Sequence, residues 1–187
     1  LQGRCRAFQA LVNDSESPMK ILPSSKDCAQ ITAQAFRNVV DGLCEFDFVI
    51  VDCPAGIEHG FHRAVSACDE AIVVTTPSAS AIRDADKVIS LLASYRLKDV
   101  SLVVNRVRSD MIARGEMLSA SEISSLLHLA PIGVIPDDDM ITLYQQLGTI
   151  PQHAISNRAY DVLAKNVAQN SKVFVDIAPK RRLRWFR

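Results

Sequence analysis

Short runs rich in valine and isoleucine, separated by stretches long enough for a helix, constrain the fold of this chain more than any other feature. Four runs are clear, at residues 46–52, 71–76, 101–105 and 132–135, and a fifth at residues 21–23 is weak. The clear runs lack the strict alternation of polar and apolar side chains that marks a strand with one face in water. We therefore predict strands buried on both faces of a parallel sheet.

The stretches between these runs have the apolar spacing of amphipathic helices. Helices are predicted at residues 27–45, 82–95 and 159–169, and a capping box of Ser119 and Glu122 opens another that continues to Leu129. Strands and helices that alternate in this way form right-handed crossovers. The sequence thus predicts an α/β fold, a mostly parallel sheet with helices on both faces, with no internal repeat and no second folded domain.

Composition narrows the class of protein. Hydrophobic residues make up 48% and charged residues 22%, and 21 cations balance 21 acids. Zero net charge argues against a general nucleic-acid binder, and no apolar run reaches the roughly 20 residues that span a bilayer. The five cysteines form no C-x-x-C pair, and their odd number favours reduced thiols in a cytosol. We expect a cytoplasmic protein and, because the sequence begins at Leu1 rather than Met, a partial or processed one.

Polar or turn-forming residues end each of the four clear runs or follow it directly. They are Asp52, Thr76–Pro77, Asn105–Arg106 and Pro136–Asp137. In an open parallel sheet, ligands bind beyond the carboxyl ends of the strands. We therefore expect these residues to converge on one edge of the sheet.

Asp52 gives the sharpest signal for chemistry. A carboxylate at the end of a buried apolar run needs a cation or hydrogen-bond donors, and Gly56 nearby lets the backbone approach a ligand closely. A strand-end Asp followed by a glycine loop is how P-loop NTPases hold Mg²⁺. The alternative, that Asp52 only caps a following helix, stays open. Cys53 is the one thiol beside this candidate site, and none of the four histidines is assigned a catalytic role.

The other strand ends give weaker signals. The amide of Asn105 offers both a donor and an acceptor, which fits the edge of an adenine, although a turn Asn beside a solvated Arg106 is the plainer interpretation. The three acids from Asp137 to Asp139 fit either a binding loop or an exposed start of a helix.

The phosphate-binding loop that a P-loop fold requires is not in this sequence. Such a loop needs Gly-Lys-[Ser/Thr] in a glycine-rich turn, and none of the seven glycines precedes a lysine. If the fold is of this type, we expect its first strand, its P-loop and its first helix to lie upstream of Leu1.

Several sequence segments, taken in their order along the chain, resemble the MinD branch of the deviant Walker A (ParA/MinD) family of ATPases. The segments that carry the resemblance are residues 46–58, 71–77, 81–86, 104–108, 114–119 and 133–138. The likeness runs from about residue 10 to about residue 147. It implies a P-loop NTPase fold of the SIMIBI type, here a partial ATPase domain at residues 1–172 followed by a basic tail at residues 173–187.

The resemblance also implies roles for residues at matching positions. Asp52 would hold the water shell of Mg²⁺, and Gly56 would belong to the switch that responds to the γ-phosphate. The nucleoside would be read or bordered by Asn105, Arg106, Pro136 and Asp137. The helix that carries Arg83, Asp84 and Asp86 would face the dimer and regulator surface. The P-loop lysines and the first switch Asp of the family have no counterpart in this sequence.

The function implied by the resemblance is placement of the division septum. ATP with Mg²⁺ would drive a homodimer onto the membrane, where it recruits the septation inhibitor MinC, and a topological regulator of the MinE or MinJ/DivIVA type would release it. The 187-residue chain alone should not hydrolyse ATP. Two alternatives stay open: a partition or flagellar-number ATPase of the same family, and a non-enzymatic truncated binding module.

The last residues of the chain interleave cations with apolar side chains. No acid follows Asp176. The final eight residues, of which five are cations, are Lys180, Arg181, Arg182, Leu183, Arg184, Trp185, Phe186 and Arg187. This pattern, together with the resemblance, predicts a peripheral anchor on an anionic membrane surface. The alternative is an unstructured basic tail.

Overall fold

A computed structural model describes residues 6–15, 17–23, 31–54, 56–147 and 155–175. Their contacts divide the chain into two compact units, residues 1–70 with 94–98 and residues 71–93 with 99–187. The first unit holds the short 3-10 helix η1 (Ala7–Ala10), β1 (Val12–Asn13), β2 (Lys20–Ile21), α1 (Ala33–Asp41) and α2 (His59–Ser66). The elements from β3 onward, apart from Glu70 at its first position, belong to the second unit: β3 (Glu70–Thr75), α3 (Ala79–Leu92), β4 (Asp99–Val107), α4 (Ser109–Ala113), α5 (Ala120–Leu127), β5 (Pro131–Pro136), α6 (Asp139–Leu147) and α7 (Ile155–Gln169).

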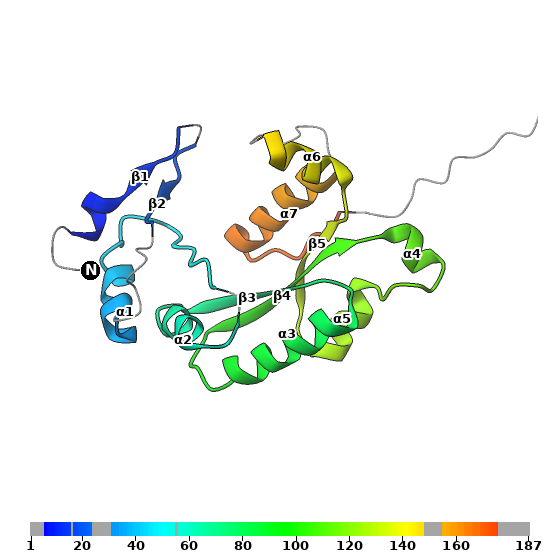
Figure 1. The fold of residues 1–187 in the computed structure, drawn as a ribbon, viewed down its shortest axis with the longest axis horizontal. Coiled ribbons are helices and arrows are strands. Elements are labelled where there is room, and N and C mark those ends of the chain that lie inside the picture. Colours follow the sequence, from blue (N-terminus) through cyan, green and yellow to red (C-terminus); the bar gives the residue numbers. More distant parts are fainter. Residues whose placement is uncertain (1–5, 16, 24–30, 55, 148–154, 176–187) are drawn as a thin grey trace, which may run out of the picture. The chain divides into compact units, whose positions relative to one another are not determined.

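The second unit is built on a sheet of strand order β3-β4-β5, in which β4 and β5 run parallel. Figure 1 shows α7 on one side of this sheet and α3 with α5 on the other, which confirms the predicted α/β fold. On the α7 side, Val103 of β4 and Ile135 of β5 pack with Ala159 in a buried cluster. Gly133 allows the close approach of α7, since an added Cβ would lie 2.8 Å from Leu163 Cδ1.

Strand alternation sends neighbouring side chains of β4 to the opposite face. Leu102 and Val104 are fully buried there, as is Ile123 of α5. The predicted runs at residues 71–76, 101–105 and 132–135 are therefore confirmed as strands. β4 is buried on both faces, as its sequence indicated.

The apolar run at residues 46–52, predicted as the strongest strand, is not one in this structure. From residue 48 onward the chain forms no regular secondary structure and joins no ladder among the described residues, and Ile50 is 89% exposed. The prediction was wrong because hydrophobicity indicates a strand but does not supply the neighbour to which its N–H and C=O groups must bond. The weak run at residues 21–23 is also different, because Ile21 ends a two-residue antiparallel pairing of β2 with β1.

Local capping signals are confirmed. Ser119 Oγ accepts from Glu122 N at 3.2 Å and Glu122 Oε2 accepts from Ser119 N at 2.8 Å, so the predicted capping box opens α5. The Ser119 hydroxyl also donates to Glu122 Oε2 at 2.7 Å, and this bond, followed by the bond from Ser119 N, lowers the pKa of Glu122. The short helices α2 and α4 were not predicted. The helix α6 begins at Asp139, where the start of a helix was one of the two interpretations. None of the described helices combines the length and hydropathy needed to cross a bilayer.

A buried amide ties α7 to the sheet and to the segment that follows it. Asn166 is 2% exposed. Its Nδ2 donates to Ile132 O at 2.8 Å and to Val173 O at 2.7 Å. Its Oδ1 accepts from Val173 N at 3.1 Å and from Ser171 Oγ at 2.7 Å. One side chain thus fixes the first residues after α7 against the start of β5.

The edge strand β3 presents an apolar face to solvent. Ile72 is 46% and Val74 60% exposed, whereas Val73 and Thr75, which point the other way, are buried. Its outer edge pairs with no strand among the described residues. Proteins usually protect such an edge with charge, proline or a bulge. Because the outer edge of β3 has no partner among the described residues, another strand can pair with it.

We expect the isolated 187-residue chain to self-associate through β3, and Val74→Lys to shift it toward the monomer. An exposed lysine would place a charge in any strand pairing while leaving the buried face of β3 intact. Sedimentation velocity measures the change, with Ser90→Lys on the exposed side of α3 as the matched control. A wild-type chain that stays monomeric at high concentration would contradict the expectation.

Candidate functional site

The carboxyl end of β4 carries a bulge at two of the predicted site residues. Val104 pairs with Val134 and Val107 with Pro136, so β4 has one more residue than β5 between these pairs. Arg106 adopts the left-handed region at φ 59°, and Asn105 Oδ1 accepts from Arg106 N at 2.9 Å. Bulges re-aim side chains at the ends of strands, and a non-glycine residue at positive φ stores strain that often marks a functional site.

The bulge brings the ends of β4 and β5 together. Arg106 Nε lies 3.3 Å from Asp137 Oδ1, and Asp137 N donates to Val107 O at 3.0 Å. The predicted convergence of these two strand ends is therefore present. The ion pair is largely exposed, so it contributes about 0–1 kcal/mol, and the backbone bond does more to fix Asp137.

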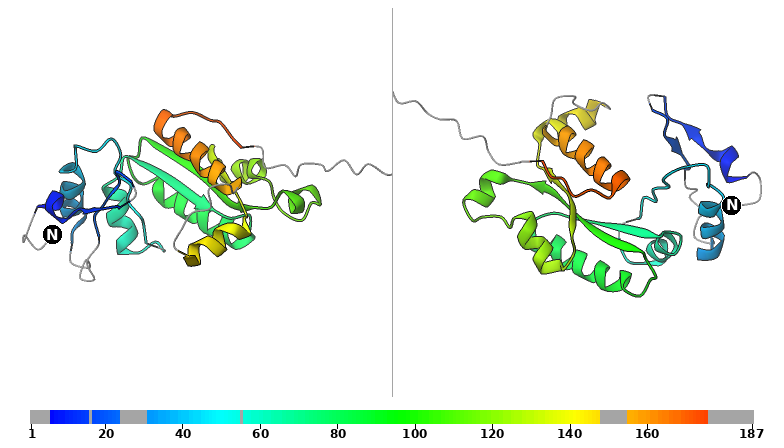
Figure 2. Two further views of the ribbon diagram at one scale, coloured as in Figure 1. Left: turned by 90° about the horizontal axis from the view of Figure 1, so that it is seen from above. Right: turned by 180° about the vertical axis from the view of Figure 1, so that it is seen from behind.

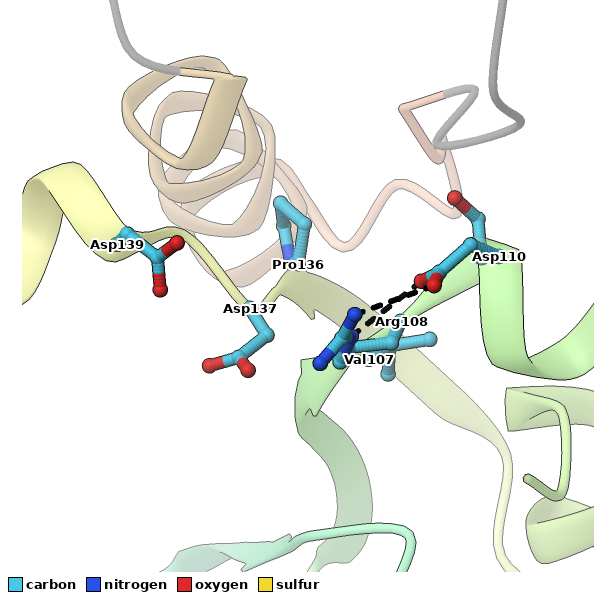
Figure 3. A pocket seen from close by; sticks show the side chains of 7 residues that line it. Val107, Arg108, Asp110, Pro136, Asp137 and Asp139 are labelled. Atoms are coloured by element: carbon cyan, nitrogen blue, oxygen red, sulfur yellow. Dashed lines mark hydrogen bonds and ion pairs between the residues drawn. The ribbon is translucent and has the colours of Figure 1, made fainter. Parts of the chain in front are cut away.

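A hollow of about 280 Å³ opens beside these strand ends and is shown in Figure 3. We call it the Arg108 pocket; its lining residues are Val107, Arg108, Ser109, Asp110, Pro136, Asp137 and Asp139. The Arg108 guanidinium donates to both carboxylate oxygens of Asp110, at 3.1 and 3.3 Å. Three acids and one guanidinium thus surround a space about the size of a small ring system.

Arg108 and Asp110 in the pocket hold each other ionised. The hydrogen bond from Arg108 lowers the pKa of Asp110. The hydrogen bond to Asp110, followed by the charges of Asp110, Asp137 and Asp139, raises the pKa of Arg108. A carboxylate accepts hydrogen bonds from amino groups, and a planar guanidinium donates and stacks. The pocket can therefore hold a flat, amine-bearing group such as a nucleobase.

Sequence reasoning assigned no role to Arg108 or Asp110, and it left Asp139 open between a binding loop and the exposed start of a helix. The only signal was their position just after two strand ends, which also fits an ordinary charged loop. Asn105, in contrast, was predicted to read adenine but is not among the lining residues, and its oxygen supports the bulge. The plainer turn interpretation describes Asn105 in this structure, and its role toward a base stays a prediction.

Asp52, Cys53 and Gly56 belong to the first unit. All three are exposed, and Gly56 adopts φ 93°, a left-handed conformation that favours glycine. Partial burial, and then the charge of Asp52, raise the pKa of the Cys53 thiol, so this cysteine is not an activated nucleophile. The strand ends that form the Arg108 pocket lie in the second unit, so the predicted meeting of Asp52 with them stays a prediction.

The predicted partner surface lies on α3, whose first turn is capped by Ser78. Arg83, Asp84 and Asp86 are exposed, and Lys87 Nζ lies 3.0 Å from Asp84 Oδ1. Pro77 and Ala79, at the start of α3, line a second hollow of about 680 Å³ together with the loop between α4 and α5. The basic residues 180–187 lie outside the described residues.

Within the described part of the chain, no group of three acids, histidines or cysteines is arranged to hold a metal ion.

Comparison with known proteins points to one family, although no family model matches. The chain is 41% identical over 152 residues to the septum site-determining protein MinD of Synechocystis, covering 79% of this chain and 57% of the relative. It is 38% identical over 175 residues to Bacillus subtilis MinD, covering 90% and 65%. The chain therefore spans less than two thirds of the length of these curated relatives.

Solved structures agree with the curated relatives. The MinD cell division protein of Aquifex aeolicus is 32% identical, with 94% of this chain and 75% of that chain covered and a TM-score of 0.84. A MinC:MinD complex from the same organism aligns at 32% identity over 91% of this chain and 71% of that chain, with a TM-score of 0.81. A Pyrococcus horikoshii MinD complexed with Mg-ADP shares the fold at 24% identity, with 88% and 70% covered and a TM-score of 0.75.

Proposed function

Because the chain belongs to the MinD family of septum site-determining proteins, we propose that the full-length protein is an ATPase that selects the site of cell division. The observation that carries the proposal within this structure is the Arg108 pocket at the carboxyl ends of β4 and β5. This is where an open α/β sheet binds its ligand. The solved relative with bound Mg-ADP supports a nucleotide as that ligand.

In this proposal the Arg108 pocket borders the nucleoside. The carboxylates of Asp137 and Asp139 accept hydrogen bonds from an amino group on the base, and Pro136 supplies apolar contact. Arg106 keeps Asp137 in place, and Asn105 shapes the bulge beside the base. The bound Mg²⁺ would supply charge neutralisation on the phosphates, and Asp52, an exposed carboxylate, fits the role of a ligand to its water shell.

The 187-residue chain by itself should not turn over ATP. It contains no Gly-Lys pair with which a P-loop could surround the phosphates. The full-length protein should hydrolyse ATP, and Asp52→Ala should lower kcat by on the order of a hundredfold because the metal-bound water loses its orientation. A coupled phosphate-release assay measures both.

Asp47→Ala is the matched control, because Asp47 is an exposed acid in the same segment and should leave kcat unchanged. Hydrolysis by the 187-residue chain that Asp52→Ala abolishes would contradict the first expectation. Full activity of the Asp52→Ala full-length variant would contradict the second.

The proposal extends to assembly. ATP binding brings two copies together, and the exposed side of α3 with Arg83, Asp84 and Asp86 recruits a septation inhibitor of the MinC type. The solved MinC:MinD complex supports this partner. A topological regulator of the MinE or MinJ/DivIVA type would then stimulate hydrolysis. The basic residues 180–187 place the dimer on the inner face of the membrane as a peripheral protein.

A further inference from the structure

Asp138 lies between two acids of the Arg108 pocket but faces away from it. Asp137 and Asp139 line the hollow, and Asp138 does not. Its Oδ2 accepts from Ser156 Oγ at 2.8 Å and from Ser156 N at 3.4 Å, and its Oδ1 accepts from Met140 N at 3.1 Å. One carboxylate therefore bonds residues in the first turns of α6 and α7.

Burial and charge strengthen the hydrogen bonds of Asp138. Ser156 is fully buried at 0% exposure, so its hydroxyl depends on Asp138 for a partner. Hydrogen bonds to an ionised acceptor are stronger than neutral ones, and a negative charge at a helix N-terminus is stabilised by the backbone dipoles. Here the carboxylate lies at two such ends.

The backbone is held on both sides of Asp138. The residue before it is fixed by the bond from Asp137 N to Val107 O, and the residue after it begins α6. α7 itself is packed against β5 through Leu163 and Ala159. The pocket acids are thus held between the sheet on one side and a buried contact of α7 on the other.

We propose that Asp138 is a positioning residue for nucleoside binding, which anchors the pocket acids Asp137 and Asp139 to α7 through Ser156. The inference rests on the proposed function, because it takes the Arg108 pocket as the nucleoside site. Its consequence is specific: Asp138 supports contacts to the base and makes none to the phosphates.

The experiment compares two probes, Mg-ADP and Mg-pyrophosphate, by calorimetry on the full-length protein well below its melting temperature. Asp138→Ala should weaken Mg-ADP binding by about tenfold, the equivalent of one lost charged hydrogen bond, and leave pyrophosphate binding unchanged. Asp138→Asn keeps one acceptor oxygen and should recover part of the loss. Ser156→Ala should weaken Mg-ADP binding in the same direction, and combining it with Asp138→Ala should add little.

Ser119→Ala is the control, since it removes the cap of α5 and should lower the melting temperature without changing either affinity. Equal Mg-ADP affinity in wild type, Asp138→Ala and Ser156→Ala would overturn the positioning role. Equal loss for both probes would also overturn it, because a general destabilisation affects both. A wild-type protein that binds pyrophosphate but gains nothing from the nucleoside would instead refute the proposed function. If Asp138→Ala does not fold, Ser156→Ala alone decides.

Discussion

Replacement of Asn166 by alanine should lower the free energy of unfolding by about 3 kcal/mol. The amide makes four hydrogen bonds at a site where it is 2% exposed, to Ile132, to Ser171 and twice to Val173. Alanine would leave the Ile132 carbonyl, the Ser171 hydroxyl and the Val173 backbone without the amide, and an unmade bond at a part-buried site is unfavourable. Urea unfolding measures the loss.

Where in the structure Asn166→Ala lowers the stability is as informative as how much it lowers the stability. Hydrogen exchange at Val173 should quicken more in Asn166→Ala than exchange within β4, because the segment after α7 loses its attachment first. Asn170→Gly is the matched control: Asn170 is exposed and adopts φ 50°, which glycine accepts. A loss below about 1 kcal/mol in Asn166→Ala would show that water replaces the amide.

Deletion of residues 180–187 should reduce vesicle binding of the ATP-bound full-length protein by at least a hundredfold. Five cations at about 1 kcal/mol each and three apolar side chains at roughly 2 kcal/mol each favour the anionic surface, and ordering eight residues at about 1–2 kcal/mol each opposes it. One segment is therefore close to neutral. Two segments on a dimer bind far better, because the second encounter is intramolecular.

Co-sedimentation with vesicles that contain anionic lipid measures this effect. Trp185→Ala with Phe186→Ala keeps all five cations and should still lose most of the binding. Equal sedimentation of the intact and truncated proteins would exclude the segment as an anchor. Binding that ATP does not increase would separate membrane attachment from dimerisation.

Much of the second unit could be predicted because its signals are local or strongly periodic. Residues 102–104 are apolar at three successive positions, and only a strand buried on both faces hides them all, as β4 does with Leu102, Val103 and Val104. The capping box of Ser119 and Glu122 depends on a spacing of three residues and holds in the structure.

What could not be predicted depends on partners far apart in the chain. Residues 46–52 are as apolar as β4, yet a strand exists only where another strand bonds to it, and none of the described residues does so. The Arg108 pocket forms because a bulge aims the end of β4 at the loop after β5, and nothing in the letters 104–108 marks a bulge. Asp138 and Ser156 are 18 positions apart, so their contact has no sequence pattern.

The helix α7 has a consequence beyond stability, because it is anchored at both ends. It spans 15 residues, roughly 22 Å. Ser156 attaches its first turn to the loop of the pocket acids, and Asn166 attaches its last turns to Val173, the region that leads toward the basic residues. α7 is thus a rigid connection between these two regions. If a bound base tilted the N-terminal end of α7, the helix would move as one body and would displace the segment that precedes the proposed membrane anchor.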